Sequence, residues 1–482
     1  MTTPNFDSLK LSRKQLIMLP LIVLVTALLW LAPSTLFGIE GLTVVEQRTI
    51  ALFVFAALMW MFEVVPTWTT SVILIVTMLL TISDSSFVFL RDHANADGFG
   101  TLVSYKAILS TFADPVIMLF LGGFILAIAA TKVGLDVQLA QWLLWPFGKK
   151  PQNVLLGFLL IIGLFSMFMS NTATAAMMLT FLAPVLKTLP PDGKGRIGLA
   201  MAIPVAANLG GIGTPIGTPP NAIALSYLNE HLHMNIGFSD WTMVMFPYVI
   251  VMLLISWRVL LWLYPFKAKT VELHIEGKSQ KNTRTYIVWI TFGVTILLWM
   301  FDKLTGVNSN VVAMIPVGVF CATGIITKED LKDINWSVLW MVSGGVALGV
   351  AMNKTGLAEH LVQSIPFHTW IPLVVLLISG LLGYLISNFI SNTAAANLIV
   401  PILSAVAVGM GGALDAVGGV KTLLVGVALS TSLAMLFPIS TPPNALTHST
   451  GLTTTQDMTK VGLIIGVIGF ILGYAMLIFI GI

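Results

Sequence analysis

The sequence predicts an all-α polytopic membrane protein with eleven spans, two re-entrant hairpins and two broken helices, arranged as an inverted repeat. Three observations lead to this fold class: the apolar composition, the positions of the basic residues, and an internal duplication. Of the 482 residues, 57% are hydrophobic and only 9% are charged, whereas soluble domains carry about 25% charged residues. Several apolar runs reach the ~20 residues that a helix needs to cross the hydrocarbon core.

The basic residues set the order of the spans. They cluster at five places, Lys10–Lys14, Lys149–Lys150, Lys187–Arg196, Lys267–Arg284 and Lys328–Lys332. Loops between the clusters, such as Ser83–Asp97 and Asn229–Asp240, carry acids or few cations. Because cytoplasmic loops are enriched in Lys and Arg, the clusters place the N-terminus in the cytoplasm and the C-terminus outside. The expected spans lie near 16–34, 49–65, 68–83, 114–131, 197–226, 242–264, 286–302, 309–327, 336–353, 421–447 and 461–481.

Two further apolar segments begin and end on the same side of the membrane, so we expect each to be a hairpin that enters and returns. Residues 151–188 have basic residues at both ends, which places both ends inside. Residues 369–408 begin and end outside. A similar motif lies within each segment, "SMFMSNT" from Ser166 to Thr172 and "SNFISNT" from Ser387 to Thr393. The first apolar run has no convincing small-residue cleavage site, so it predicts a first span and not a removed signal peptide.

The two S-N-T motifs belong to an internal repeat. Gly122–Gly123 recurs as Gly344–Gly345 and Lys132 as Lys354, both 222 residues later. "GTPPN" at 217–221 recurs as "STPPN" at 440–444, 223 residues later. The duplicated units are roughly 49–264 and 286–482. Five crossings separate the copies, and this odd number inverts the second one. Inverted repeats with interrupted helices in corresponding positions are a signature of secondary transporters.

The T-P-P-N motifs predict the two broken helices. "GGIGTPIGTPPN" (210–221) holds four glycines and three prolines within an expected span, so the helix there must unwind. Thr218 and Thr441, each followed by proline, have the form of an N-cap that starts a new half-helix. Ser, Asn and Thr at each hairpin tip are also good N-cap types. Four half-helix N-termini would therefore meet near the midplane, where they favour an anion such as a carboxylate.

No Arg or Lys falls in the predicted centre. An anion there needs charge compensation, and free carbonyls with Ser or Asn oxygens suit a hard monovalent cation. The sequence therefore favours cotransport of an anion with a cation over bare anion conduction. A single S-N-T would more often be interhelical hydrogen-bond glue, but two copies beside two broken helices favour a binding site.

Other functional classes find little support. No G-x-S-x-G or H-E-x-x-H is present, so we expect no enzyme, and no basic tract with aromatics suggests nucleic acid. The single Cys321 excludes an internal disulfide. His231 and His233 lack the spacing of a metal site. Several charged residues near span ends are expected at the interface or in scaffold positions; they are Glu63, Lys132, Arg258 and Lys354.

At the S-N-T and T-P-P-N motifs the chain resembles the divalent anion:sodium symporter (DASS, or INDY) family over essentially its whole length. That resemblance implies sodium ions and a di- or tricarboxylate bound at the hairpin tips and unwound segments. The first implied sodium site comprises Ser166, Ser170, Asn171 and Gly217, and the second comprises Ser387, Ser391, Asn392, Ser440 and Pro442. The implied carboxylate contacts are Asn171, Thr172, Thr218, Asn392, Thr393 and Thr441.

The resemblance also implies a homodimer in the inner membrane with an elevator-type transport domain. The scaffold would comprise residues 1–147 and 265–368, and the transport domain residues 148–264 and 369–482. Expected substrates are C4-dicarboxylates (succinate, malate, fumarate), then citrate, then sulfate. Some members of the family are sodium-independent exchangers that keep S-N-T. Two alternatives to sodium-coupled symport therefore stay open: a sodium-independent exchanger, and an anion channel built on re-entrant half-helices.

Overall fold

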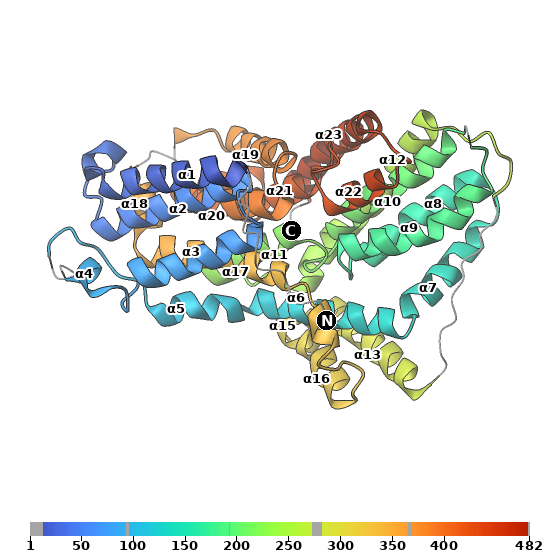
Figure 1. Cartoon of the computed structure of the whole chain (residues 1–482), viewed down its shortest axis with the longest axis horizontal. Helices are drawn as coiled ribbons and strands as arrows, with labels where there is room; N and C mark the ends of the chain where they lie inside the picture. The colour runs from blue at the N-terminus through green and yellow to red at the C-terminus, as the bar shows by residue number, and fades with distance from the viewer. Residues whose placement is uncertain (1–12, 93–95, 192, 272–281, 365–368, 481–482) are drawn as a thin grey trace.

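This computed structural model describes residues 13–92, 96–191, 193–271, 282–364 and 369–480, and within these ranges every regular element is a helix apart from one isolated bridge between Ser83 and Val103 (Figure 1). The α-helices up to the middle of the chain are α1 (Arg13–Leu31), α2 (Val44–Phe62), α3 (Thr67–Thr81), α4 (Val88–Arg91), α5 (Tyr105–Ser110), α6 (Pro115–Lys132), α7 (Leu135–Leu144), α8 (Pro151–Ser166), α9 (Asn171–Lys187), α10 (Gly195–Gly211), α11 (Pro219–Ser226) and α12 (Phe238–Leu263). The later ones are α13 (Thr283–Met300), α14 (Asp302–Thr305), α15 (Ser309–Val312), α16 (Met314–Ala322), α17 (Trp336–Lys354), α18 (Leu357–Ser364), α19 (Pro372–Ser387), α20 (Asn392–Met410), α21 (Gly419–Ser432), α22 (Pro442–Ser449) and α23 (Thr455–Phe479).

A helix or broken helix stands at each of the eleven expected spans, which confirms the predicted fold class. By length and apolarity alone, eight helical stretches of the described chain could cross a membrane. The expected spans at 68–83 and 309–327 are shorter helices, and those at 197–226 and 421–447 are interrupted. The last span begins at Thr455, six residues before its expected start, because Thr454 and Asp457 form a capping box that starts the helix in polar sequence. Residues 10–12 of the first basic cluster, residues 272–281 of the fourth and residues 481–482 lie outside the described residues.

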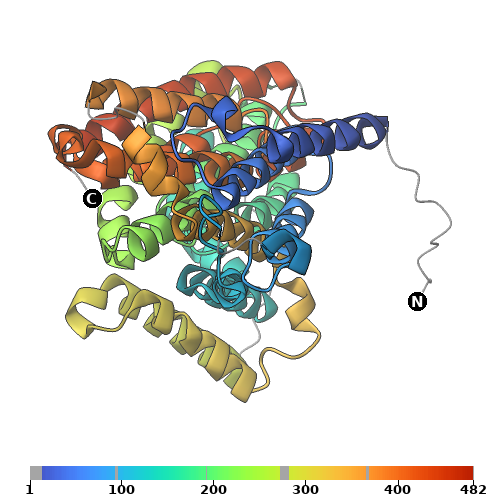
Figure 2. The same ribbon diagram turned by 90° about the vertical axis from the view of Figure 1, so that its left-hand side faces the viewer.

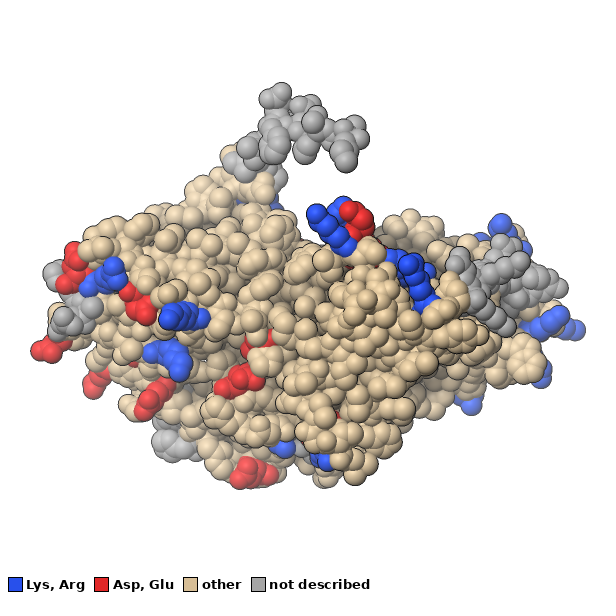
Figure 3. Space-filling view, turned by 90° about the horizontal axis from the view of Figure 1, so that it is seen from below, with Lys and Arg blue, Asp and Glu red and all other residues tan. Residues whose placement is uncertain are grey.

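Charge is concentrated at the two ends of the long axis. In Figure 3, Lys and Arg predominate at one end and Asp and Glu, mixed with some Lys and Arg, at the other, and the surface between them is mostly uncharged with scattered charged side chains. The helices run mainly along this axis (Figure 1). An apolar girdle bounded by charged caps is the surface expected of a protein that spans a bilayer.

The two hairpins enter from opposite ends of the molecule (Figure 1). The chain reverses between α8 and α9 at residues 167–170 and between α19 and α20 at residues 388–391. The first arm of each hairpin packs on the broken helix of its own repeat, α8 on α10 and α19 on α21. The second arm packs on the short half-helix of the other repeat, α9 on α22 and α20 on α11. The repeats therefore interlock at the centre.

The repeated Gly-Gly pairs lie in α6 and α17, where they let helices approach closely on two sides. A Cβ on Gly122 would lie 2.1 Å from the Ala313 carbonyl oxygen, and one on Gly344 would lie 2.4 Å from Ser71 Cβ. Gly345 faces the other way, where a Cβ would lie 1.9 Å from Asn397 Oδ1 of α20. The two glycines of a pair thus pack on different neighbours. Helices α13 to α16 form a separate layer beneath α6 (Figure 2).

Site-directed labelling tests the inversion. Lys187 ends the first hairpin and Asp415 follows the second, and both side chains are exposed. In a Cys321→Ser background, Lys187→Cys and Asp415→Cys are expected to react with a membrane-impermeant maleimide from opposite sides of sealed vesicles. Reaction of both cysteines from one side would contradict the inverted arrangement.

Candidate functional site

A cluster of four oxygen atoms lies at the tip of the first hairpin. Ser166 Oγ lies 2.6 Å from Asn171 Oδ1 and donates to the Ala207 carbonyl oxygen at 2.7 Å. Asn171 Oδ1 also lies 3.2 Å from the Ala207 oxygen and 3.1 Å from the Gly217 oxygen. The amide oxygen of Asn171 thus faces only acceptors, and an amide nitrogen in its place would donate to all three of them. With the oxygen in this position, the four oxygens would suit a hard cation.

Backbone contact between glycines makes this cluster possible. A Cβ on Gly210 would lie 2.3 Å from the Gly163 carbonyl oxygen, so α8 and α10 touch without side chains between them. A Cβ on Gly211 would lie 2.7 Å from Asn171 Oδ1, and one on Gly217 would lie 2.3 Å from the Gly211 oxygen. Only glycine leaves room for these carbonyl groups to converge on the hairpin tip.

The second hairpin repeats the arrangement. Ser387 Oγ lies 2.8 Å from Asn392 Oδ1 and donates to the Thr431 carbonyl oxygen at 2.9 Å. Thr431 therefore corresponds to Ala207. Ser166 and Ser387 are both fully buried. This matching geometry brings Ser166 with Asn171 and Ser387 with Asn392, as the resemblance implied.

The other predicted ligands have visible structural roles. Ser170 and Ser391 are N-caps whose hydroxyls accept from the backbone N–H of Ala173 and Ala394, at 3.2 Å each. Ser440 Oγ donates to the Asn388 carbonyl oxygen at 2.9 Å, within the second hairpin, and Pro442 is the first residue of α22. The role of these four residues as cation ligands stays a prediction.

The predicted carboxylate contacts lie on the first turns of helices or just before them. Thr172 and Thr393 follow Asn171 and Asn392 at the starts of α9 and α20. The N-caps of α11 and α22 are Thr218 and Thr441. Thr172 is exposed, whereas Thr393 is 6% exposed. Thr172 is thus the more exposed of the two tip threonines.

Three participants escaped the sequence analysis. Ala207 and Thr431 contribute backbone oxygens, which leave no mark in the side-chain sequence. Asn208 joins the repeats: its Nδ2 donates to Thr441 Oγ1 at 3.1 Å and to Asn444 Oδ1 at 3.2 Å. Asn208 could have been identified from the sequence, because an asparagine within an expected membrane span needs a polar partner.

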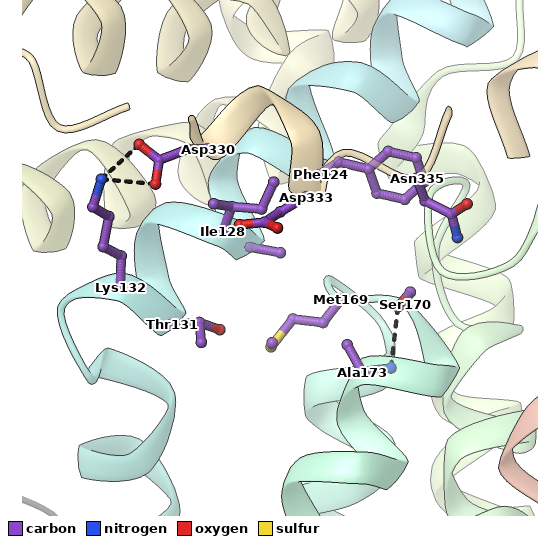
Figure 4. Close-up of a pocket in the computed structure, with 11 residues that line it drawn as sticks. Phe124, Ile128, Thr131, Lys132, Met169, Ser170, Ala173, Asp330, Asp333 and Asn335 are labelled. Carbon is purple, nitrogen blue, oxygen red and sulfur yellow. Dashed lines mark hydrogen bonds and ion pairs between the residues drawn. The ribbon is translucent and has the colours of Figure 1, made fainter. Parts of the chain in front are cut away.

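A cavity of about 430 Å³ reaches the tip of the first hairpin. Met169, Ser170 and Ala173 line it from the hairpin, and Asp333 and Asn335 line it from the segment before α17 (Figure 4). At its edge Lys132 Nζ lies 2.6 Å from a carboxylate oxygen of Asp330. The volume is in the range of small-molecule sites. The cavity opens at the end where basic residues were predicted to be cytoplasmic.

The ion pair at this cavity should resist mild acid. The Lys132 ammonium group lowers the pKa of Asp330 to about 2. A carboxyl whose pKa is depressed stabilises the fold above its ordinary pKa and loses that contribution as the pH falls toward the folded value. The melting temperatures of the parent protein and Asp330→Asn should therefore differ equally at pH 7 and pH 5 and converge near pH 2. A difference that vanishes by pH 5 would contradict this assignment.

A second cavity, of about 920 Å³, lies at the opposite end of α6 and α17. Polar contacts cross it or flank it: Ser226 Oγ lies 3.3 Å from Asp114 Oδ2, and Asn353 Nδ2 lies 2.8 Å from His231 Nδ1. Burial lowers the pKa of His231 to about 4, which keeps the ring neutral and its Nδ1 available as an acceptor. Neither S-N-T tip lines this cavity.

Comparison with known proteins identifies the family and several relatives of this chain. The citrate transporter family model (CitMHS) matches residues 57–418. An uncharacterized transporter of Haemophilus influenzae is 32% identical over 76% of this chain and 81% of its own length. The sodium-dependent dicarboxylate transporter SdcS of Staphylococcus saprophyticus is 28% identical over 90% of this chain and 86% of its own.

Two further matches either cover less of the related protein's length or have a lower sequence identity. The inorganic phosphate transporter PHO87 of Saccharomyces cerevisiae is 29% identical over 83% of this chain, which spans only 42% of that protein. The crystal structure of the Alcanivorax borkumensis YdaH transporter, which reports an unusual topology, aligns with a TM-score of 0.55 at 13% identity, covering 89% of this chain and 97% of that one. This last likeness concerns the fold alone.

Proposed function

Because the chain belongs to the citrate transporter family and is therefore a membrane transporter and not an enzyme, we propose that it imports C4-dicarboxylates together with at least two sodium ions. The observation that carries this proposal is the pair of matching contacts of a buried serine with the asparagine of its S-N-T motif, Ser166 with Asn171 and Ser387 with Asn392, at the starts of α9 and α20. The likeness to SdcS, a sodium-dependent dicarboxylate transporter, supports both the sodium and the dicarboxylate. Succinate, malate and fumarate are the expected substrates.

Charge balance explains why sodium and dicarboxylate would bind together. Helix N-termini attract carboxylates but carry only about half an elementary charge each. Two sodium ions at the two clusters would neutralise the two charges of a dianion held between Asn171 and Asn392. Thr172, Thr218, Thr393 and Thr441 supply hydroxyl and backbone donors around it. Each bound ion then strengthens the binding of the other, which is the thermodynamic requirement for coupling.

An elevator motion fits the polar contacts between the two proposed bodies. Asn397 Nδ2 of α20 donates to the Met341 carbonyl oxygen of α17 at 2.8 Å, and Tyr227 Oη donates to the Gly345 oxygen at 3.2 Å. Both contacts involve backbone carbonyls at helix crossings lined by glycine. Side-chain contacts also join the bodies, such as Ser226 with Asp114 and Asp240 with Lys303, and the motion would have to break them. The scaffold would comprise 1–147 and 265–368, and the transport domain 148–264 and 369–482. The exposed first tip corresponds to the inward-facing state of a homodimeric inner-membrane protein with a cytoplasmic N-terminus and an outside C-terminus.

Uptake into proteoliposomes tests the proposal. Purified protein should accumulate radiolabelled succinate when an inward sodium gradient is imposed and should not do so with potassium replacing sodium. Accumulation that needs internal succinate and ignores sodium would identify a sodium-independent exchanger. Preference for phosphate over succinate would place the chain nearer to PHO87 in substrate. Passive sodium-independent flux would identify a channel.

A further inference from the structure

The two repeats differ at one buried contact where their broken helices meet. Because Ser166 bonds to the Ala207 oxygen and Ser387 to the Thr431 oxygen, the residues that follow, Asn208 and Ser432, are structural counterparts. Asn208 is 1% exposed and Ser432 is 2% exposed. The long amide of one repeat is thus matched by a short hydroxyl in the other.

On the Asn208 side the amide oxygen of Asn444 is bonded across the contact, although Asn208 Oδ1 is itself buried without a hydrogen-bond partner among the described residues. Asn208 Nδ2 reaches Thr441 Oγ1 and Asn444 Oδ1 across the contact of α10 with α22. Thr441 Oγ1 also donates to Asn444 Oδ1 at 3.0 Å. Asn444 Nδ2 donates to the carbonyl oxygens of Met435 and Phe437, in the unwound segment, at 2.9 and 3.0 Å. The amide oxygen of Asn444 therefore receives two donors.

On the Ser432 side the corresponding oxygens have no partners. Asn221 Nδ2 holds the carbonyls of Gly211 and Thr214 at 3.0 and 2.8 Å, as Asn444 does in its repeat. Within the described chain, however, Asn221 Oδ1 and Ser432 Oγ are buried without a hydrogen-bond partner. Thr218, 3% exposed, makes no side-chain capping bond, unlike Thr441. Helices α11 and α21, which carry these residues, pack on each other.

We propose that Asn221 Oδ1, Ser432 Oγ and Thr218 Oγ1 bind an additional sodium ion where α11 meets α21. Amide and hydroxyl oxygens are the neutral ligands that hard monovalent cations accept. A buried amide oxygen with no donor is satisfied by a cation as well as by a proton donor. The substrate carboxylate expected near Thr218 supplies the opposite charge. The site rests on the proposed function and extends it, because a third sodium with a dianion moves one net positive charge per cycle.

Replacing Ser432 by asparagine tests the site, because Ser432→Asn would supply the amide that Asn208 provides on the other side. In proteoliposomes, an inside-negative potassium diffusion potential should stimulate sodium-driven succinate uptake by the parent protein. Ser432→Asn should lose the stimulation, and its Hill coefficient for sodium should fall by about one. Ser430→Ala is the matched control on the same helix, since Ser430 Oγ donates to Tyr474 Oη at 3.2 Å instead; it should behave like the parent.

The outcomes separate this inference from the proposed function. Sodium-driven uptake that is indifferent to the potential in the parent protein overturns the third site and leaves the proposed function intact. Equal stimulation of the parent and Ser432→Asn also overturns it. Should Ser432→Asn fail to fold, Ser432→Ala removes one ligand without adding bulk, and it should raise the sodium concentration for half-maximal uptake by about tenfold; an unchanged value contradicts the site.

Discussion

Asn171→Ala and Asn392→Ala are each expected to reduce sodium-driven succinate uptake by about 100-fold or more. Each change removes an amide that touches its buried serine and, in the proposal, both a sodium ion and the substrate. Loss of a hydrogen bond to a charged group costs ~1.5–3 kcal/mol, and two such losses at one residue account for the magnitude. The pseudo-symmetry predicts comparable losses in the two variants.

Transport by the purified variants is the measurement, with Asn310→Ala as the control. Asn310 is a partly exposed asparagine in the short helix α15, away from both clusters, and its variant should transport normally. Size-exclusion profiles and thermal melts establish that each variant is folded. Normal sodium-driven uptake by either tip variant would remove the assigned residue from the site.

Gly210→Ala is expected to abolish transport while leaving membrane insertion intact. The new methyl group would lie 2.3 Å from the Gly163 carbonyl oxygen and 2.7 Å from Gly163 Cα. These are backbone atoms, so α8 and α10 must separate. That separation moves Ser166 away from the Ala207 oxygen and opens the first cation cluster. Overpacking of this kind typically costs ~1–3 kcal/mol, and a shift of about 1 Å in a site can cost about 100-fold in rate.

Gly318→Ala is the matched control for this effect. Gly318 lies in α16, is exposed, and a Cβ there would meet no atom within 4 Å. Both changes add one methyl group to a membrane helix and both improve helix propensity. Gly318→Ala should therefore transport at the parent rate. If Gly210→Ala transports at the same rate as Gly318→Ala, close contact between α8 and α10 is not required for the cation cluster.

The interruptions of the helices were predictable from sequence because they break an otherwise uniform apolar pattern. S-N-T, T-P-P-N and the glycine-rich run at 210–217 stand out within lipid-compatible sequence, and their spacing revealed the inverted repeat. Ser166 and Ser387 were also predictable. Each lies five residues before the asparagine of its S-N-T motif, and the structure bonds each pair across the turn.

The remaining parts of the site depend on contacts between segments distant in sequence. Ala207 and Thr431 contribute through carbonyl oxygens that any residue type carries. Asn208 acquires its role only because inversion brings α10 against α22 of the other repeat. The difference between Asn208 and Ser432 has no meaning until the matched bonds of Ser166 and Ser387 align the two positions. The true start of α23 was hidden because its first turn is polar.

Equilibrium binding of radiolabelled succinate to the purified protein, measured across a sodium titration, tests the central claim most directly. If the two oxygen clusters hold sodium beside the carboxylate, succinate affinity must rise cooperatively with sodium, with a Hill coefficient above one, and sodium affinity must rise equally with succinate. Asn171→Ala should lose both effects. Succinate that binds with the same affinity in sodium-free potassium buffer would contradict the account.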